Sequence, residues 1–424
     1  MERYSSYKDS GISWIGDIPS HWNVIKLNHI FYHNTGKTLN SNLKGNNHPY
    51  LTTSNVYNGY FDLSILKEMP FLDDEIERYS VTAGDLLVCE GGDIGRCNIW
   101  KENYSICYQN HLHRLRAKID IKVEYYSFLI NHIKSLGIFD NMGKGIAIKG
   151  LSAATLGNTR LLLPPLAEQE KIVSYLENKT SKIDAYVADK EKEIELLQEL
   201  KQKTIADAVT KGLNPDAKMK DSKTSLFGQI PAHWEERKMK YCFNERSEKN
   251  HPEEPVLCAT QSQGVIPQSL YQNRVVVVNK GFEGLKFVKV GDFVISLRSF
   301  EGGIEYAYYQ GIISAAYTIL TPRKAECADY FKLLFKCYPF IQVLQTCVTG
   351  IREGQNINYQ MLGRKYIPLP PLDEQRAIVS YIEEKYQKID SLTTELQAEI
   401  DHLKEYKQRL IADVVTGQVN VQNH

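Results

Sequence analysis

The chain contains one long segment twice, and this duplication constrains the fold more than any other feature. Residues 164–210 align without a gap to residues 370–416, at an offset of 206, with 25 identities in 47 positions. A second pair of similar segments, residues 8–22 and 220–234, matches at an offset of 212. The 424-residue chain is therefore a tandem duplication.

Two bodies of similar length but faint likeness, residues 24–163 and 235–369, lie between the repeated segments. Short echoes still connect them: residues 84–88 resemble 291–295, and residues 156–157 resemble 362–363. Short β-rich runs alternate with turn signals in both bodies, and helical patterns are fewer. We therefore expect two α+β bodies of one fold, built to read two different things. The clearest runs are the β-rich 85–89 and 274–278 and the helical 125–136 and 328–344.

Each repeated segment predicts one continuous helix, because no Pro or Gly follows the double proline until Gly212 in one copy and Gly417 in the other. From residue 168 to 210, at about 1.5 Å per residue, such a helix spans roughly 65 Å. A body of this size should be much shorter, so part of each helix needs another partner, and the other copy is the nearest candidate.

The apolar positions of these two helices, called the arms below, step by three, four, seven or eight residues, as in a coiled-coil seam. The alternative is that each stripe packs only on its own body. The helix-pairing residues that we predict are Ile172, Leu176, Ile183, Val187, Ile194, Leu197 and Ile205 in the first arm, and Ile378, Ile382, Ile389, Leu396, Ile400, Leu403 and Ile411 in the second.

The fold class that these patterns predict is α+β: two tandem α/β domains joined by two long antiparallel coiled-coil helices, related by a pseudo-twofold axis. Residues 1–163 would hold the first domain with its lead-in segment, and residues 164–211 the first long helix. Residues 212–369 would hold a linker, the second lead-in segment and the second domain. Residues 370–424 would hold the second long helix and a tail.

Charge is distributed unevenly although the net charge is zero. The first body has 15 Lys and Arg against 13 Asp and Glu, and the second has 17 against 13. The arms have 7 against 10 and 6 against 10. Basic bodies on acidic arms favour contact of the bodies with nucleic acid, while the arms face protein or solvent.

The eight cysteines form no Cys-x-x-Cys pair, which favours reduced thiols in a cytoplasmic protein. The first residues have no apolar signal core, and no run reaches the roughly 18 apolar residues of a membrane helix. We therefore expect a soluble, cytoplasmic protein without membrane contact.

Polar loops in both bodies have side chains suited to base edges, since Arg matches guanine and Asn or Gln matches adenine. The alternative for each is an ordinary turn residue. The candidates for DNA contact are Thr53, Ser54, Asn55, Gln109, Asn110, Lys144 and Lys149 in the first body, and Thr260, Gln261, Arg298, Ser299, Arg352, Gln355 and Asn356 in the second.

The sequence shows no motif of catalysis or nucleotide binding. The Pro-Pro pairs lack the flanking residues of an amino-methyltransferase, no Gly-x-Gly loop opens a helix, and Phe31 stands where a P-loop before Gly36-Lys37-Thr38 needs Gly. His111 and His113 fit a strand better than a metal site, because no third ligand has a plausible spacing. We therefore expect no catalytic residue, no metal and no cofactor bound by this chain.

The repeated arms and lead-in segments carry a resemblance to a known family. Pro-Pro-Leu-x-Glu-Gln opens each arm at residues 164–169 and 370–375, and Gly-x-Ile-Pro-x-His-Trp precedes each body at 16–22 and 228–234. Weaker echoes lie at 50–56 and 299–303. In this pattern the whole chain resembles the specificity subunit of type I restriction-modification systems.

The resemblance implies two target recognition domains, each reading half of a split, asymmetric sequence in double-stranded DNA. It also implies partners that supply all the chemistry: two modification (methyltransferase) subunits that bind S-adenosylmethionine, and restriction (translocase and nuclease) subunits that use ATP and Mg. The alternatives are a duplicated coiled-coil scaffold without DNA contact and a fused enzyme that turns over alone.

Overall fold

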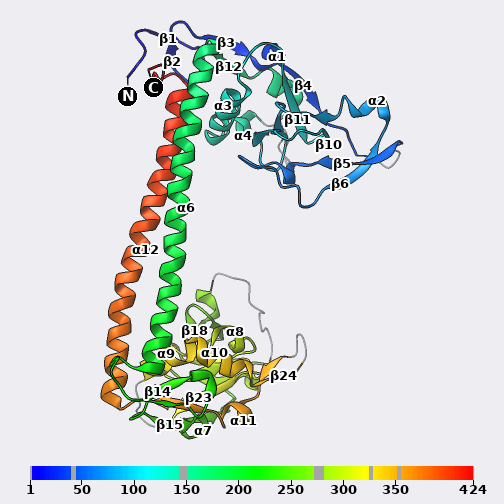
Figure 1. Ribbon diagram of the computed structural model, residues 1–424. Coiled ribbons are helices and arrows are strands. Elements are labelled where there is room, and N and C mark those ends of the chain that lie inside the picture. The colour runs from blue at the N-terminus through cyan, green and yellow to red at the C-terminus, as the bar shows by residue number, and fades with distance from the viewer. Residues whose placement is uncertain are drawn as a thin grey trace. The chain divides into compact units, whose positions relative to one another are not determined.

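The computed structural model describes residues 2–39, 44–142, 150–271, 281–323, 328–350 and 355–423 (Figure 1). They fall into two units, which we treat separately. The first unit is Met1–Lys190 with Ala398–His424, and the second is Glu191–Gln397. Each unit thus contains one body together with one part of each arm.

Each unit begins with a small antiparallel β-ribbon from its lead-in segment. In the first unit, β1 (Tyr7–Asp9) pairs with β2 (Asp17–Pro19). In the second unit, β13 (Met219–Asp221) pairs with β14 (Gln229–Pro231) in the same register at the offset of 212.

The first body is an α+β fold with two four-stranded sheets, in the orders β4-β11-β8-β9 and β6-β5-β10-β7, and a strand pair β3-β12. Within these sheets β5 and β10 run parallel, and the other neighbours run antiparallel. Its strands are β3 (Asn23–Lys26), β4 (Phe31–Thr35), β5 (Asn46–Leu51), β6 (Lys67–Phe71), β7 (Ser80–Val81), β8 (Leu86–Cys89), β9 (Cys97–Ile99), β10 (Ile106–Tyr108), β11 (Leu112–Ala117) and β12 (Arg160–Leu163). Its helices are α1 (Leu27–Ile30), η1 (Thr53–Asn55), α2 (Asp73–Ile76), α3 (Val123–Ser135), α4 (Ile138–Met142) and α5 (Ala153–Gly157).

The second body repeats the antiparallel sheet of the first, in the order β16-β23-β20-β21, and pairs β15 with β26 as the first body pairs β3 with β12. Its strands are β15 (Glu235–Lys238), β16 (Phe243–Arg246), β17 (Leu257–Thr260), β18 (Gly264–Pro267), β19 (Lys286–Val288), β20 (Phe293–Ile295), β21 (Glu305–Tyr306), β22 (Gly311–Ile313), β23 (Thr318–Pro322), β24 (Val348–Thr349), β25 (Asn356–Ile357) and β26 (Tyr366–Leu369). Its helices are α7 (Met239–Cys242), η3 (Gln268–Leu270), η4 (Phe282–Gly284), α8 (Ser299–Gly302), α9 (Ala328–Lys336), α10 (Tyr338–Gln345) and α11 (Tyr359–Leu362), and η2 (Ser225–Phe227) precedes the body.

The short sequence echoes mark the same structural position in both bodies. Asp85 and Asp292 are each 2% exposed at the start of an equivalent strand. Their carboxylates accept from the backbone N–H groups of Thr82 and Lys289, each over 2.8 Å. A buried carboxylate needs such partners, so the position keeps its Asp while the surrounding residues change. The expected common α+β fold is confirmed.

The predicted helical runs are present, with one interruption. Residues 125–136 lie in α3 and the turn after it. Residues 328–344 form α9 and α10, separated at Cys337, because Pro339 in the first turn of α10 cannot donate to a continuing helix. The strand predicted at 85–89 is β8, and residues 274–278 lie outside the described residues.

The arms are the continuous helices α6 (Leu166–Lys211) and α12 (Leu372–Val415). Gly212 and Gly417 follow with φ of 72° and 76°, the left-handed conformation that ends many helices. At the start of each arm a glutamine side chain donates back to the first proline's carbonyl, Gln169 to Pro164 and Gln375 to Pro370, each over 2.9 Å. The long helices predicted from the absence of Pro and Gly are confirmed.

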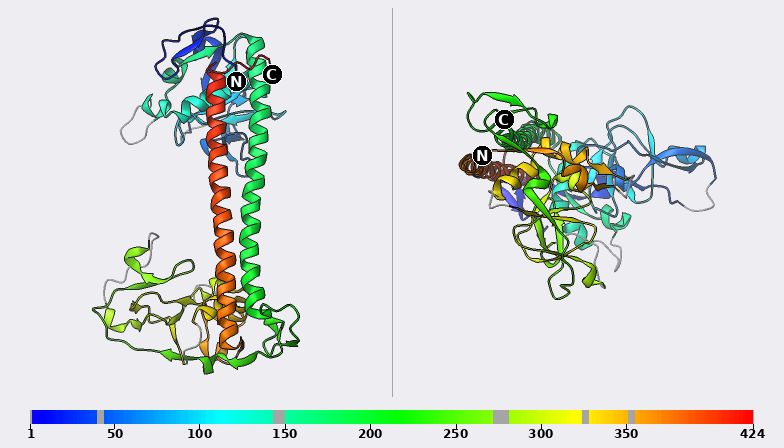
Figure 2. Two further views of the ribbon diagram at one scale, coloured as in Figure 1. Left: turned by 90° about the vertical axis from the view of Figure 1, so that its left-hand side faces the viewer. Right: turned by 90° about the horizontal axis from the view of Figure 1, so that it is seen from below.

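Within each unit the arms lie side by side and antiparallel (Figures 1 and 2). In the first unit Lys190 pairs with Glu399 and Lys407 with Asp184, so the partner number falls as the residue number rises. In the second unit Lys201 pairs with Asp390, which is the duplicate of the Lys407–Asp184 pair at the offset of 206.

All the predicted helix-pairing positions are buried or half-buried. Ile205, Ile378 and Ile382 belong to the same apolar core as Trp234, Phe243 and Tyr330 of the second unit. The ends of the arms therefore pack on the body. The alternative to arm pairing predicted such packing for the whole apolar stripe of each arm. The buried positions are Ile172, Leu176, Ile183, Val187, Ile205, Ile378, Ile382, Leu396 and Ile400, and the half-buried ones are Ile194, Leu197, Ile389, Leu403 and Ile411.

Within the described ranges, no helix has the length and apolar character needed to cross a membrane. The seven cysteines inside those ranges are all buried free thiols, and Cys327 lies outside them. Burial raises the pKa of Cys89 to about 11, which makes its thiolate scarce at neutral pH.

Candidate nucleic-acid interface

The first recognition loop, as we call residues 52–55 after β5, has one side chain fully engaged in holding the turn. Asn55 is 5% exposed and accepts from the backbone N–H and the hydroxyl of Thr52, each over 2.8 Å. Its amide donates to the carbonyls of Asp62 and Ile65. Ser54 is exposed, with its hydroxyl 2.7 Å from that of Thr52, and Thr53 is half-buried.

Arg96, from the loop between β8 and β9, lies against this recognition loop. Its Nη2 donates to the carbonyl of Thr53 over 2.5 Å, and its guanidinium carbon lies 5.0 Å from the centroid of the Tyr57 ring. Tyr57 in turn stacks on Tyr60 with ring centroids 4.8 Å apart. The sequence analysis did not select Arg96, because its neighbourhood to residue 53 exists only in the folded body.

The Gln109–Asn110 turn lies next to the first recognition loop. The backbone N–H of Gln109 donates to the carbonyl of Leu51, and that of Asn110 donates to the carbonyl of Lys37. Both side chains are half-buried. Four of the first body's candidates, Thr53, Ser54, Gln109 and Asn110, therefore lie around the carboxyl end of β5.

The second recognition loop, as we call residues 260–263, forms the hairpin turn between β17 and β18. Thr260 is 4% exposed, and its hydroxyl donates to the carbonyl of Gly264 over 2.9 Å while accepting from Gln263. It holds the turn as Asn55 does in the first body. Gln261 is exposed and free to contact DNA.

Arg298 precedes α8, and Ser299 is the first residue of that helix. Ser299 is 1% exposed, and its hydroxyl accepts from the backbone N–H of Ser296 over 2.8 Å. Arg298 is exposed, and its carbonyl accepts from the backbone N–H of Glu301 over 2.9 Å. Gln355 is exposed and Asn356 half-buried at the start of the hairpin strand β25. Lys144, Lys149 and Arg352 lie outside the described residues.

A polar pocket of about 340 Å³ opens beside the second recognition loop. Glu305 is 3% exposed in it, and burial raises the pKa of its carboxyl to about 6 although the nearby Lys336 opposes the shift. The Lys336 ammonium lies 2.5 Å from Oε1 of Glu305. Lys332 lies over the ring of Tyr306, 3.9 Å from its centroid.

Each unit has a joint where one arm begins and the other ends. In the first unit the Glu168 carboxylate, in the first turn of α6, accepts from Trp22 Nε1 over 3.0 Å and from Tyr4 over 3.1 Å, and lies 2.6 Å from His21 Nε2. In the second unit Glu374 lies 2.8 Å from His233 Nε2. The His of each lead-in segment therefore meets the Glu of each arm, and in the first unit the Trp does so as well.

A tyrosine from each body closes the joint. Tyr125 of α3 donates to the carbonyl of Val415, at the end of α12, over 2.9 Å. Tyr330 of α9 donates to the carbonyl of Val209, near the end of α6, over 3.2 Å. Carbonyls at a helix end lack partners within the helix, so each tyrosine satisfies one of them.

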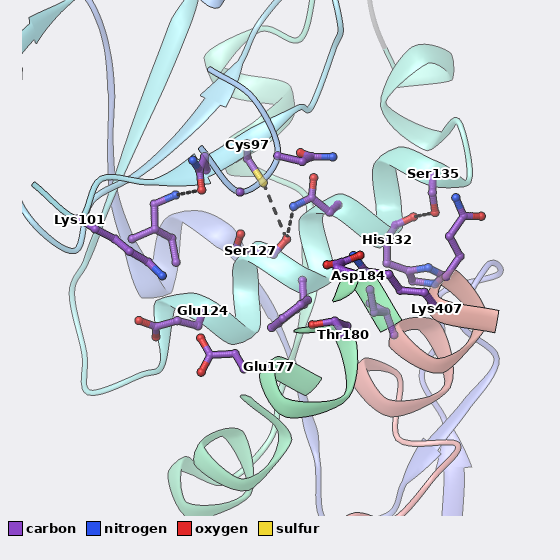
Figure 3. Close-up of a pocket in the computed structure, with 18 residues that line it drawn as sticks. Cys97, Lys101, Glu124, Ser127, His132, Ser135, Glu177, Thr180, Asp184 and Lys407 are labelled. Carbon is purple, nitrogen blue, oxygen red and sulfur yellow. Dashed lines mark hydrogen bonds and ion pairs between the residues drawn. The ribbon is translucent and has the colours of Figure 1, made fainter. Parts of the chain in front are cut away.

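A mixed-charge pocket of about 410 Å³ in the first unit lies between α3 and the two arms (Figure 3). Glu124 and Glu177 lie at one side, and Asp184 and Lys407 at the other. Burial lowers the pKa of His132 in its lining, and Asp413 opposes the shift. Across the described part of the chain, no cluster of three or more His, Cys, Asp or Glu side chains could hold a metal ion.

His111 and His113 have separate environments. His113 is 1% exposed on β11, and its Nε2 lies 2.7 Å from the carbonyl of Leu151. His111 is exposed and 3.9 Å from Glu90. His33 lies against His113 with ring centroids 4.8 Å apart, and burial together with His113 lowers the pKa of His33 to about 4.

Comparison with known proteins gives one consistent family. The model of the type I restriction modification DNA specificity domain matches residues 19–196 and 232–402. A Methanocaldococcus jannaschii protein named as the specificity subunit of the type I restriction enzyme MjaX is 26% identical over 428 aligned positions, covering 96% of both chains. The specificity subunit of the type I restriction enzyme EcoBI from Escherichia coli is 23% identical over 373 positions, covering 82% of this chain and 76% of that one.

Solved structures resemble the chain in fold. A chain from a structural study of complex assembly and conformational transition in a type I R-M system has a TM-score of 0.68 at 17% identity, covering 95% of this chain and 99% of that one. The HsdS subunit from Thermoanaerobacter tengcongensis has a TM-score of 0.53 at 18% identity, covering 95% and 98%.

Proposed function

Since the chain belongs to the family of the type I restriction modification DNA specificity domain, we propose that it reads a bipartite, asymmetric target in double-stranded DNA and positions modification and restriction subunits on it. Residues 1–163 and 212–369 would contain the two target recognition domains, and residues 164–211 and 370–424 the helices that connect them.

One observation carries the proposal: the two bodies keep one antiparallel sheet and differ in the polar loops attached to it. Residues 52–55 read Thr-Thr-Ser-Asn and residues 260–263 read Thr-Gln-Ser-Gln. Residues 52–55 form a 3-10 turn held by Asn55, whereas residues 260–263 form the hairpin turn between β17 and β18, held by Thr260. A scaffold protein has no reason to vary the loops on a sheet that it keeps. A pair of DNA readers needs that variation, because side-chain chemistry selects the base.

The arms carry apolar surface suited to two copies of one partner. Tyr186 and Tyr406 of the first unit are 63% and 48% exposed, and Leu392 and Leu200 of the second unit are 39% and 50% exposed. Leu392 and Leu200 are the duplicates of Tyr186 and Tyr406 at the offset of 206. We call these pairs the first and second arm patches. Large exposed apolar groups mark interaction sites, and duplicated patches suit the two modification subunits.

The partners would supply the chemistry in this proposal. The modification subunits would bind S-adenosylmethionine, and the restriction subunits would use ATP and Mg. The residues of this chain would select the DNA site. Base contacts would come from the recognition loops, and the paired Lys and Asp residues would fix the register of the arms.

Salt dependence of duplex binding separates this function from that of a scaffold without DNA contact. The chain assembled with its modification subunits is mixed with duplex carrying the host's split methylation motif, and affinity is measured from low to high salt. Phosphate contacts make the affinity fall linearly on a logarithmic plot against salt concentration. Absence of duplex binding by the assembled complex at low salt would support the scaffold instead.

A further inference from the structure

In both bodies a cation from a distant segment binds a backbone carbonyl of the recognition loop. Arg96 Nη2 donates to the carbonyl of Thr53 over 2.5 Å, and Lys336 Nζ donates to the carbonyl of Gln261 over 3.2 Å. Thr53 and Gln261 are the second residues of the loops 52–55 and 260–263. Arg96 lies in the loop between β8 and β9, whereas Lys336 is the last residue of α9. Two different elements therefore provide the cations that bind the loop carbonyls.

The contacts around Arg96 fix its guanidinium in the first body. The side chain is 18% exposed, with Nη1 3.5 Å from Asp93 and the guanidinium carbon 5.0 Å from the ring centroid of Tyr57. Held by a carboxylate, a ring and a carbonyl, the guanidinium is directed at the loop backbone. It therefore restrains the peptide group that follows Thr53.

The ammonium group of Lys336 is fully hydrogen-bonded in the second body. Its ammonium donates to the carbonyls of Gln261 and Gly302 and to the Glu305 carboxylate, at 3.2, 2.9 and 2.5 Å. An ammonium has three N–H donors, so these three acceptors use all of them. A Cβ on Gly302 would lie 2.6 Å from Cδ of Gln261, which shows how closely the two loops approach.

A fixed carbonyl matters most where the side chain beside it must meet a base edge. The carbonyl and the side chain of one residue share a Cα, so rotation of the peptide group moves the side chain. Recognition requires first-contact groups to be held by the residues around them. Both cations already donate to acceptors of their own body.

We propose that Arg96 and Lys336 are positioning residues that set base discrimination in the first and second half-site respectively. The inference rests on the proposed function and deepens it, because it assigns the precision of each recognition loop to one residue outside that loop. Each residue should act on its own half-site alone.

The test uses the full chain assembled with its modification subunits and S-adenosylmethionine. Equilibrium binding is measured with the cognate duplex and with duplexes that carry one substituted base pair in either half-site. The variants are Arg96→Gln and Lys336→Gln, with Arg96→Lys and Lys336→Arg as conservative rescues. The matched controls are Arg116→Gln, which removes an arginine paired with Asp85 in the first body, and Lys286→Gln, which removes a lysine bound to the Tyr317 carbonyl in the second.

Arg96→Gln should lower the preference for cognate over substituted duplex by roughly three- to tenfold at the first half-site, on the scale of a weakened base contact, and leave the second unchanged. Lys336→Gln should do the reverse. The rescues should recover part of the preference, and the controls should leave both preferences intact. A purely structural role would reduce the active fraction equally on every duplex without changing these ratios.

Equal loss of affinity on all duplexes, or loss of preference at both half-sites from one variant, would overturn the proposal. If the glutamine variants do not assemble, the Arg96→Lys and Lys336→Arg variants provide the test. Preferences at both half-sites that are unchanged in these two variants, and equal to those of the controls, would overturn the proposal too. Failure of the proposed function is a different result: the unaltered assembly would then prefer no duplex over any other.

Discussion

The Nζ atom of Lys407 lies 2.6 Å from Oδ1 of Asp184, joining the two arms of the first unit by an ion pair whose duplicate, Lys201 with Asp390 at 2.7 Å, joins them in the second. The two pairs give both units the same antiparallel register. Their side chains are partly exposed, so each pair sets alignment more than stability.

Burial, rather than charge, should stabilise the arms. Ile400 is 1% exposed, so Ile400→Asp should lower the free energy of unfolding by several kcal/mol, on the order of 3, because an unpaired charge enters an apolar seam. Adding Ile194→Asp, at a half-buried position, should add a smaller loss. Asp184→Asn should cost under about 1 kcal/mol. Denaturant unfolding measures all three, with Leu392→Asp at a 39% exposed position as the control. Equal losses for Ile400→Asp and Leu392→Asp would contradict the seam.

Loss of the glutamate should destabilise the joint of the first unit more than the joint of the second unit. Glu168→Ala leaves Trp22 Nε1 buried without its acceptor, which should cost about 1 to 3 kcal/mol. Glu374→Ala should cost less, because Trp234 Nε1 already has no hydrogen-bond partner within the described residues. Denaturant unfolding of both variants compares them directly, and a larger loss from Glu374→Ala would be inconsistent with this difference.

Acid should weaken the first body through its histidine pair. The pKa of His33 falls to about 4 on folding, from its ordinary value of 6.5, because burial and His113 disfavour its charged form. Its contribution to stability is therefore present above pH 6.5 and is lost as pH falls from there through about 4. The loss is at most about 1.4 kcal/mol per pH unit for one proton. His33→Gln should reduce this pH dependence, measured by denaturant unfolding between pH 7.5 and 4.5. The same change at the exposed His29 should not, and an unchanged slope in His33→Gln would count against the pair.

The arm patches should each capture one modification subunit. Tyr186→Ser with Tyr406→Ser removes the first patch, and Leu200→Ser with Leu392→Ser removes the second. Each double variant should bind one modification subunit where the unaltered chain binds two, because the loss of apolar area is confined to one patch. The mass of the assembled complex measures this, and the two variants serve as controls for each other. Retention of two subunits by both variants would place the docking surface elsewhere.

The arms were predictable from sequence because their signals are local. A run without Pro or Gly, bounded by Pro165 and Gly212, predicts one helix without any tertiary information. The recognition loops were not predictable to the same depth. Asn55, Thr260 and Ser299 have the side chains of base readers, yet the fold uses them to hold turns, since the same donors and acceptors serve both purposes.

Arg96 and Lys336 could not be found from sequence for a different reason. Arg96 is 43 residues from Thr53, and Lys336 is 75 residues from Gln261. Nothing in the local sequence connects the members of either pair. Only the folded body brings them together, and the duplication does not help because the two cations come from different elements.

Exchange of one body tests the central claim most directly. Residues 24–163 are replaced by the equivalent body of a relative, with the joins in the lead-in segment and before Pro164, and methylated adenines are mapped across the genome of cells that express the complex. The methylated motif should change in one half and keep its other half, because each body reads its own segment of DNA. A change in both halves together would contradict independent reading and require a single recognition surface.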